Sequence, residues 1–263
     1  MSQSQAFLTK TIREAGEILK RHFANPQYTI TEKSGVDFTT QADTETDAFI
    51  RRVILREYPD AALLTEETAP DNQNYSDLGK AKQLFIVDPL DGTTNFKHGV
   101  PHFAISIAEV VYGEVVTAII YKPISDELFM ATKDQEGATK NGKPIKVSAT
   151  QALREAVIAC DWPWDLGKRH FIPEWLSKLH PKVRQIKIMG SAVSDLASLA
   201  SGTIDVYIHA YLKPWDVAGA SLIVEKAGGK ITTSTGEKWD IFKPDILASN
   251  KVLHDEILEL LSS

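Results

Sequence analysis

Apolar side chains recur at helical spacing in two segments near the start of the chain. The second segment covers residues 49–54 and is entered through the polar stretch TTQADTETD, whose threonines and aspartates suit the first turn of a helix. In the first two dozen residues, the apolar side chains that share one helical face are Leu8, Ile12, Ala15, Leu19 and Phe23. The pattern therefore predicts two amphipathic helices.

A run of short apolar segments follows, separated by turn residues. Residues 28–32 predict a short strand before the polar loop KSGVD, and "AALLTEE" and "QLFIVDP" predict buried strands, the second ended by Pro89. Between residues 101 and 146, "FAISIAEVV", "EVVTAIIY" and "ELFMATK" alternate with turn signals such as Asn141-Gly142. This part of the chain is predicted to form a β-meander.

The second half alternates between strands and helices. Strands are predicted near residues 156–160, 185–189, 205–209 and 246–249, and helices near 191–200, 217–227 and 252–261. The Gly228-Gly229 pair closes the middle helix. The order of elements predicts a layered α/β or α+β sandwich, as one domain over residues 1–263, with subdomains of about 1–147 and 148–263.

Composition narrows the class of protein. A hydrophobic content of 43% and a charged content of 24% over 263 residues are typical of a soluble globular domain with a sizeable core. The net charge is −6 and the basic residues are scattered, so we expect no nucleic acid polymer as partner, although a small nucleotide substrate stays open. Cys160 is the single cysteine, which excludes an internal disulfide and a cysteine-based zinc site.

The chain carries no run of apolar residues long enough for a membrane span, and its first residues lack the apolar core of a signal peptide. We therefore expect a cytoplasmic protein without membrane contact.

Carboxylates lie at the ends of three apolar segments. Each has an ordinary explanation: "DPLDG" makes a good turn, Glu66 and Glu67 could form a solvated strand end, and Asp216 could cap a helix. A buried carboxylate nevertheless has to recover its lost hydration from a cation or a donor. Glu66, Asp88, Asp91 and Asp216 together offer the hard oxygen ligands that suit Mg²⁺ or Mn²⁺ shared with a substrate phosphate.

Gly92 and Thr93 follow the acidic pair directly. Glycine lets the backbone approach a ligand closely, and the N–H groups at a helix start bind phosphate oxygens. The stretch therefore predicts a phosphate site beside the metal site.

Three motifs resemble the inositol monophosphatase family of Mg²⁺-dependent, lithium-sensitive phosphatases. They are "VDPLDGTTNF" (87–96), "TEE" (65–67) and "WDVAGASLIVEKAGG" (215–229), and the order of elements agrees over nearly the whole chain. The resemblance implies a five-layer α-β-α-β-α sandwich, a homodimer, and hydrolysis of phosphate monoesters with two or three Mg²⁺ ions, for which Mn²⁺ can substitute.

The resemblance also implies roles for individual residues. The attacking water would be oriented and deprotonated by Thr93 with Asp43, alongside Glu66, while Gly92 and Thr93 hold the phosphate. Lys33 matches a basic residue near the third metal position. The positions that match the metal ligands of the family are Glu66, Asp88, Asp91 and Asp216, with Leu90 through its carbonyl group.

Substrate recognition is implied less specifically. Gly190, Ser191 and Ala192 match a G-[ST]-A stretch that, with Asp216, meets substrate hydroxyls. His209 stands where the animal enzymes carry a glutamate, so it could accept a hydroxyl, could favour a second phosphate together with Lys213, or could simply end a strand.

The aromatic and basic loop 162–170 lies where the family varies. Trp162 and Trp164 could stack on a substrate, and Arg169 or His170 could reach a phosphate. Alternatively, the tryptophans cover a subdomain seam or a dimer interface.

The leading hypothesis is an inositol monophosphate phosphatase. Alternatives with the same ligand set are fructose 1,6-bisphosphatase, 3′-phosphoadenosine 5′-phosphate phosphatase and histidinol-phosphate phosphatase. A catalytically silent regulatory binding protein is the alternative from another class, and it would be expected to lack a metal carboxylate or the Thr93–Asp43 pair, whereas all of these residues are present.

Overall fold

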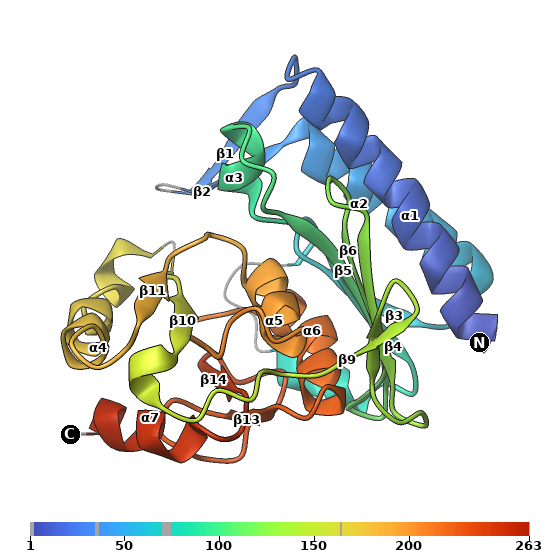
Figure 1. Ribbon diagram of the computed structural model, residues 1–263. Helices are drawn as coiled ribbons and strands as arrows, with labels where there is room; N and C mark the ends of the chain where they lie inside the picture. Colours follow the sequence, from blue (N-terminus) through green and yellow to red (C-terminus); the bar gives the residue numbers. More distant parts are fainter. Residues whose placement is uncertain (1–2, 35–36, 70–74, 164, 263) are drawn as a thin grey trace.

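The chain folds into five alternating layers of helices and sheets (Figure 1). The computed structural model describes residues 3–34, 37–69, 75–163 and 165–262. Two helices cover a seven-stranded sheet, two more helices separate this sheet from a five-stranded sheet, and a last pair of helices covers the outer face of the second sheet. The predicted layered sandwich is confirmed.

The first layer consists of α1 (Gln3–Ala24) and α2 (Gln41–Glu57), which pack on β4, β5 and β6. The apolar face predicted for α1 is buried, since Leu8, Ile12 and Leu19 have no exposed surface. Helix α2 begins at Gln41 because the Thr40 side chain accepts a hydrogen bond from the N–H of Ala42 (3.2 Å), which satisfies one of the free donors of the first turn.

The seven strands of the larger sheet follow one another in chain order. Strands β3 and β4 are parallel and the remaining pairs are antiparallel. The strands are β3 (Ala62–Thr65), β4 (Leu84–Asp91), β5 (Ala104–Val111), β6 (Glu114–Lys122), β7 (Glu127–Thr132), β8 (Ala138–Lys140) and β9 (Lys143–Ile145).

The prediction that Pro89 ends its strand is wrong, because β4 continues through Asp91. The register with β5 shifts between Asp88 and Asp91, so the strand accommodates the missing N–H of Pro89 in an irregularity of the ladder. Asp88 and Asp91 therefore lie on either side of this irregularity in one strand rather than on a free turn.

The middle layer contains α5 (Ala192–Ala200) and α6 (Pro214–Lys226). Helix α6 begins three residues before the predicted start, with Pro214 in its first turn. Its approach to the larger sheet requires a glycine, since a Cβ at Gly219 would lie 2.4 Å from Ser106 Oγ on β5.

The smaller sheet has the strand order β11-β10-β12-β14-β13. Its strands are β10 (Val157–Cys160), β11 (Gln185–Lys187), β12 (Val206–His209), β13 (Lys230–Thr232) and β14 (Ile246–Ser249). Helices α4 (Phe171–Leu179) and α7 (His254–Ser262) cover its outer face. Neither α4 nor β13 was expected from the sequence, because each is short and α4 carries a proline at position 173.

A two-stranded hairpin of β1 (Ile30–Ser34) and β2 (Asp37–Thr40) and the short helix α3 (Thr93–Lys97) complete the architecture. Strand β2 takes up the end of the segment predicted as a polar loop, of which residues 35 and 36 lie outside the described residues.

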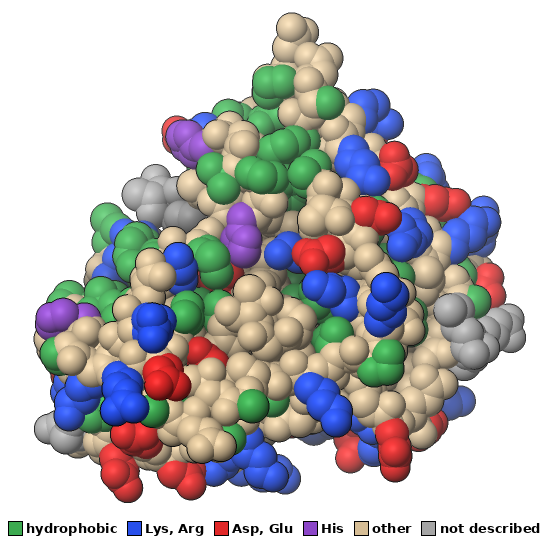
Figure 2. Space-filling model, viewed as in Figure 1, with side chains coloured by type: hydrophobic (Ala, Val, Ile, Leu, Met, Phe, Trp, Pro, Cys, Tyr) green, Lys and Arg blue, Asp and Glu red, His purple; other side chains and the backbone are tan. Residues whose placement is uncertain are grey.

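Basic and acidic side chains are intermingled on the visible face of the molecule (Figure 2). No continuous basic surface is seen on this face, as the scattered lysines and arginines of the sequence predicted. Within the described parts of the chain, no helix has the length and apolar character needed to cross a membrane.

Candidate metal and phosphate site

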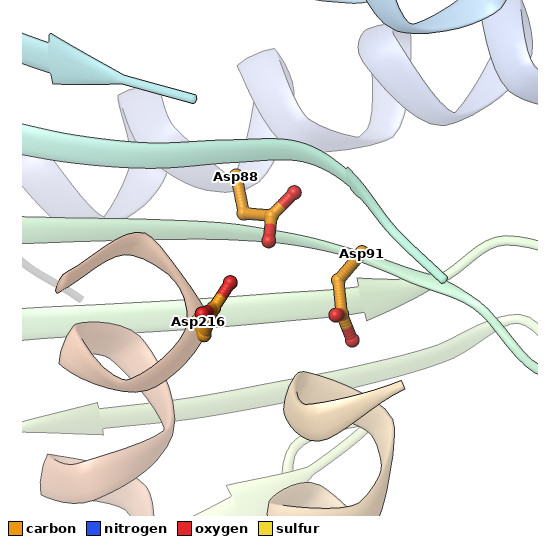
Figure 3. Close-up of side chains that lie close together, drawn as sticks. All are labelled: Asp88, Asp91 and Asp216. Atoms are coloured by element: carbon orange, nitrogen blue, oxygen red, sulfur yellow. The ribbon is translucent and has the colours of Figure 1, made fainter. Parts of the chain in front are cut away.

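Three carboxylates converge where the two sheets meet the middle helices (Figure 3). Asp88 and Asp91 project from β4, and Asp216 projects from the first turn of α6. One oxygen of each carboxylate lies within 4.8 Å of the others. The sequence predicted this convergence from segments more than 120 residues apart.

The carboxylates of this cluster repel one another. Burial raises the pKa of Asp88 well above its ordinary value, and the neighbouring charges of Glu66, Asp91 and Asp216 raise it further. Burial likewise raises the pKa of Asp91, although hydrogen bonds from Ser191 and Val193 lower it. Such a cluster is stable in its charged form only when a cation balances it.

Glu66 follows β3 and lies beside this trio rather than within it. Burial raises its pKa well above the ordinary value, while Lys33 lowers it. Lys33 Nζ lies 3.2 Å from Glu66 Oε1 and 2.8 Å from Glu67 Oε1, and Thr39 Oγ1 donates to Glu67 Oε2 at 2.9 Å. Lys33 and both glutamates therefore form one group that ties the β1–β2 hairpin to the end of β3.

Thr93 and Asp43 are in direct contact. The Thr93 hydroxyl lies 2.9 Å from Asp43 Oδ1 and 3.1 Å from the carbonyl oxygen of Leu90. Asp43 is the third residue of α2, where its other oxygen accepts the N–H of Thr40 at 2.9 Å and caps the helix. Burial raises the pKa of Asp43 to about 6, against the lowering effect of the Thr40 and Thr93 hydrogen bonds.

A side chain at Gly92 would be strained and would crowd its neighbours. Its φ of +94° is left-handed, and a Cβ there would lie 3.0 Å from the carbonyl oxygen of His102 and 3.2 Å from Ser191 Cβ. The glycine therefore brings the start of α3 against the start of α5, whose Val193 N–H donates to Asp91.

A contact between the two halves of the chain was not expected from the sequence. Asp91 Oδ2 accepts hydrogen bonds from the Ser191 hydroxyl and from the N–H of Val193, the latter at 2.8 Å. Ser191 was expected to meet substrate hydroxyls; its side chain is buried and donates to Asp91 at the start of α5. The signal that could have found it is the N-cap position of a serine before an apolar helix.

The segment that precedes α5 is held from two sides. Asp161 Oδ1 accepts the N–H of Gly190 at 2.9 Å. Asn95 Nδ2 donates to the carbonyl groups of Met189 (2.6 Å) and His102 (2.8 Å). These contacts fix Gly190, whose φ of +77° places it in the left-handed region.

Asp161 also belongs to a second buried acidic pair with Asp195 of α5. Their side chains face each other within hydrogen-bonding range, and no donor among the described residues reaches Oδ2 of either carboxylate. The second oxygen of Asp195 lies 2.8 Å from His102 Nε2. Burial raises the pKa of both carboxyl groups to about 8, the charge of Asp91 raises both further, and the charge of Asp195 raises that of Asp161, so the pair retains a proton at pH 7.

His209 lies at the end of β12 and is only 5% exposed. Burial lowers its pKa to about 4, so the ring is neutral at pH 7, and its Nδ1 has no hydrogen-bond partner among the described residues. Lys213 is exposed, and its backbone N–H donates to Asp216 Oδ2 at 2.7 Å.

The loop 162–170 contacts itself in the described residues. Arg169 Nε donates to the carbonyl oxygen of Pro163 at 2.8 Å, and its guanidinium lies 5.7 Å from the centre of the Trp162 ring. His170 lies within 3.2 Å of the carbonyl oxygen of Gly167. Trp164 lies outside the described residues.

The donor set fits a divalent cation. It consists of carboxylate oxygens from three elements, it is largely buried, and Lys33 lowers the pKa of Glu66 at its edge. Hard oxygen ligands with an excess of negative charge suit Mg²⁺, Mn²⁺ or Ca²⁺.

Comparison with known proteins identifies the family of this chain. A profile of the inositol monophosphatase family matches residues 1–263. The chain is 31% identical over 257 residues to "Fructose-1,6-bisphosphatase/inositol-1-monophosphatase" of Thermotoga maritima, covering 97% of this chain and 94% of that protein. It is 32% identical over 245 residues to "Nus factor SuhB" of Escherichia coli K12, covering 92% and 89%.

Among solved structures, the extragenic suppressor protein suhB of Bartonella henselae superimposes with a TM-score of 0.91. The two sequences are 33% identical, and the match covers 100% of this chain and 99% of that one. The same architecture therefore extends over the full chain. The chain belongs to the inositol monophosphatase family and is a phosphatase hydrolase.

Proposed function

We propose that this protein hydrolyses small phosphate monoesters in a Mg²⁺-dependent reaction, with inositol monophosphate as the leading substrate. The observation that carries the proposal is the convergence of Asp88, Asp91 and Asp216 within 4.8 Å beside the N-termini of α3 and α5. An acidic cluster repels a phosphate unless cations lie between them. The neighbouring backbone N–H groups are suited to hold the phosphate itself.

The residues that would hold the ions are Glu66, Asp88, Asp91, Asp216 and the Leu90 carbonyl group. Bound Mg²⁺ would supply charge neutralisation and lower the pKa of water, and Mn²⁺ has compatible ligand preferences. The number of ions, two or three, is part of the proposal.

Thr93 and Asp43 would position a water molecule, and their direct contact supports this role. The Thr93 hydroxyl has one proton, and while it donates to Asp43 or to the Leu90 carbonyl its lone pairs remain able to accept from water. A pKa of about 6 leaves Asp43 ionised at pH 7 yet basic enough to receive a proton through Thr93. Glu66 lies at the same end of the sheet and would accept from the same water.

The Gly190–Ala192 segment, with Asp216, is proposed to meet the substrate hydroxyls. A neutral His209 favours a hydroxyl partner over a second phosphate, because an uncharged ring brings no attraction for a dianion. Exposed Lys213 stays the candidate for any further anionic group. In this proposal, residues 1–147 carry the metal and phosphate site apart from Asp216, and residues 148–263 carry substrate recognition.

The names of two relatives support alternative functions, which the experiment has to distinguish. The Thermotoga relative is named for both fructose 1,6-bisphosphate and inositol 1-phosphate, so the sugar bisphosphate competes as substrate. The relative named Nus factor supports a regulatory binding role as the second candidate function. A homodimer and a cytoplasmic location are further expectations that the family suggests.

The test is phosphate release in Mg²⁺, with and without Li⁺. The panel contains myo-inositol 1-phosphate, fructose 1,6-bisphosphate, 3′-phosphoadenosine 5′-phosphate and histidinol phosphate, ranked by kcat/KM. We expect lithium-sensitive turnover that is highest for the inositol ester and absent in EDTA. Turnover that persists in EDTA, or a folded protein without release from any ester, would contradict the proposal, and the second result would favour the binding role.

A further inference from the structure

Helix α2 carries a second buried carboxylate one turn beyond Asp43. Asp47 is 3% exposed, and its spacing of four residues from Asp43 places both side chains on the face of α2 that packs against the larger sheet (Figure 1). A buried carboxylate needs donors that replace its lost hydration. The partners of Asp47 therefore indicate why the chain keeps a charge at this position.

The charge of Asp47 has few partners. Arg51 Nη1 lies 3.7 Å from Asp47 Oδ2, and the arginine side chain is 40% exposed, so this ion pair contributes little. Asp47 Oδ1 has no hydrogen-bond partner among the described residues. The hydroxyl group of Thr65, which is itself buried, forms a hydrogen bond with the Asp47 side chain. Asp47 therefore depends on Thr65 for a buried donor.

The hydroxyl protons give this contact a direction. A threonine hydroxyl has one proton to donate. Because the Thr65 hydroxyl donates to the Asp47 carboxylate, the Thr68 hydroxyl, 2.8 Å away, has to donate to Thr65. Thr68, Thr65 and Asp47 therefore form a hydrogen-bond chain that ends on a charged acceptor, and hydrogen bonds to charged acceptors are the stronger ones.

This hydrogen-bond chain encloses the turn that carries Glu66 and Glu67. Thr65 is the last residue of β3, and its carbonyl oxygen accepts the N–H of Thr68 at 3.3 Å. The two residues on either side of the glutamates are thus joined through their side chains as well as through the backbone. The position of the turn relative to α2 therefore depends on Asp47.

The neighbouring strand has the same arrangement. Strands β3 and β4 are parallel, so both end at the same edge of the sheet. Asp43 accepts the hydroxyl of Thr93, just beyond β4, and Asp47 accepts the hydroxyl of Thr65, at the end of β3. Helix α2 therefore holds the ends of two adjacent strands, one followed by the proposed water-positioning threonine and the other by the proposed metal ligand Glu66.

We propose that Asp47 is a positioning residue for the metal site, which acts through Thr65 on Glu66. The inference rests on the metal-binding role of Glu66 in the proposed function. Removal of a group that holds a metal ligand in place typically weakens metal binding about 10–100-fold. Without the hydrogen-bond chain, the turn loses its attachment to α2, and ordering Glu66 then costs binding free energy.

The experiment is a calorimetric titration of the full chain with Mn²⁺ in the absence of substrate, which measures binding without turnover. Asp47→Asn and Thr65→Val are each expected to raise the Kd about 10–100-fold. Thr65→Val removes the hydroxyl at nearly constant volume and keeps the charge of Asp47, so it separates the hydrogen bond from long-range attraction of the cation. Thr65→Ser keeps the hydroxyl and is expected to restore the affinity.

Further variants make the result specific. Thr46→Val removes a neighbouring hydroxyl on α2 that is fully buried and has no hydrogen-bond partner among the described residues, and it is expected to leave the Kd unchanged. Thr68→Ala changes an exposed position and is expected to raise the Kd about threefold, so the test does not depend on buried substitutions alone. The double variant Asp47→Asn/Thr65→Val is expected to bind no more weakly than the weaker single variant, because both changes break the same hydrogen bond.

Wild-type affinity in folded Asp47→Asn and Thr65→Val would overturn the proposal. Weaker binding in Asp47→Asn with wild-type affinity in Thr65→Val would also overturn it, because this result would indicate a long-range effect of the charge. Equal losses in Thr65→Val and Thr46→Val would do the same, because they would indicate a general effect of repacking beside α2. A wild type that binds no Mn²⁺ would contradict the metal site of the proposed function, and the role of Asp47 with it.

Discussion

The substitution Asp161→Asn replaces the titratable proton of the Asp161–Asp195 pair with amide hydrogens that do not titrate. The carbonyl group of the new side chain would still accept the N–H of Gly190, now bound by Asp161 Oδ1 at 2.9 Å. Its amide would donate to Asp195 Oδ2, an oxygen without a donor among the described residues. The substitution thus keeps the volume and supplies the hydrogen that the wild-type pair has to take from solvent.

The magnitude follows from the pKa values. Both carboxyl groups have a folded pKa of about 8, against an ordinary value of 3.8. A carboxyl group whose pKa is raised by folding destabilises the fold as pH rises from the unfolded value towards the folded one. Each pH unit costs about 1.4 kcal/mol for each retained proton, so at pH 7 each carboxyl group costs the fold about 4 kcal/mol, and the variant should regain the share of Asp161.

Other charged groups around the pair set its pKa but do not change this sign. The charge of Asp91 raises both values, while Lys122 lowers that of Asp195 and His102 lowers that of Asp161. The buried hydroxyl of Tyr207 lies near both carboxyl groups and stays neutral over the range of the assay, since its pKa is raised well above 10.

The assay is urea unfolding in EDTA from pH 4.5 to pH 8, compared between wild type and Asp161→Asn. The carboxylates of the metal site are present in both proteins, and the loss of the interaction between Asp91 and Asp161 is part of the measured difference. We expect a gain in unfolding free energy that is small at pH 4.5 and grows by about 1.4 kcal/mol per pH unit. Asp60→Asn, which changes an exposed carboxylate, should show no such slope. A difference that does not vary with pH, or a loss of stability at pH 7, would refute the shared proton.

Three further outcomes are expected. Asp91→Asn should lower Mg²⁺-dependent phosphate release at least about a hundredfold while the fold stays intact, because it removes one charge at constant volume; near wild-type turnover would exclude a role in metal binding. Thr93→Ala should lower kcat by about 10²–10⁴ without changing the Mg²⁺ concentration for half-maximal rate, and Thr93→Ser should restore it; a weaker Mg²⁺ response at unchanged kcat would contradict the water-positioning role. Gly219→Ala should cost about 1–3 kcal/mol in urea unfolding, since its Cβ would lie 2.4 Å from Ser106 Oγ, and Ser106→Ala should recover part of that loss; strictly additive effects would show that the two side chains do not clash.

The sequence predicted the elements that have a strong period or a specific motif. The helical face of α1, the meander from β5 to β7 and the position of α5 all follow from apolar spacing and are confirmed. Helix α4 and strand β13 escaped prediction, because nine and three residues carry too little pattern to outweigh neighbouring loop signals. The continuation of β4 past Pro89 depends on a register shift against β5, which is a property of two strands and not of one.

Part of the candidate site could likewise be predicted from the sequence, and part of it could not. The carboxylates that converge in the fold were found because each stands at the end of an apolar run and the motifs are specific. The supporting hydrogen bonds were not predicted. Ser191 and Val193 donate to Asp91. Asn95 and Asp161 bind the backbone of the segment before α5. Their side chains are common in turns and caps, and only their positions in the folded chain distinguish a supporting contact from a solvated one.

These supporting contacts connect the two halves of the chain, so the site is complete only when both halves are folded together. Asp91 belongs to β4, but two of its hydrogen bonds come from the start of α5, and Asp216 comes from the start of α6. Each half alone would therefore leave buried carboxylates without their donors and too few ligands for a cation. Because like charges at this distance repel, docking the halves without a cation works against the packing of α5 and α6 on the larger sheet. Cation binding and the docking of the two halves should therefore be thermodynamically coupled, so that a divalent ion stabilises the middle layers as well as any bound phosphate.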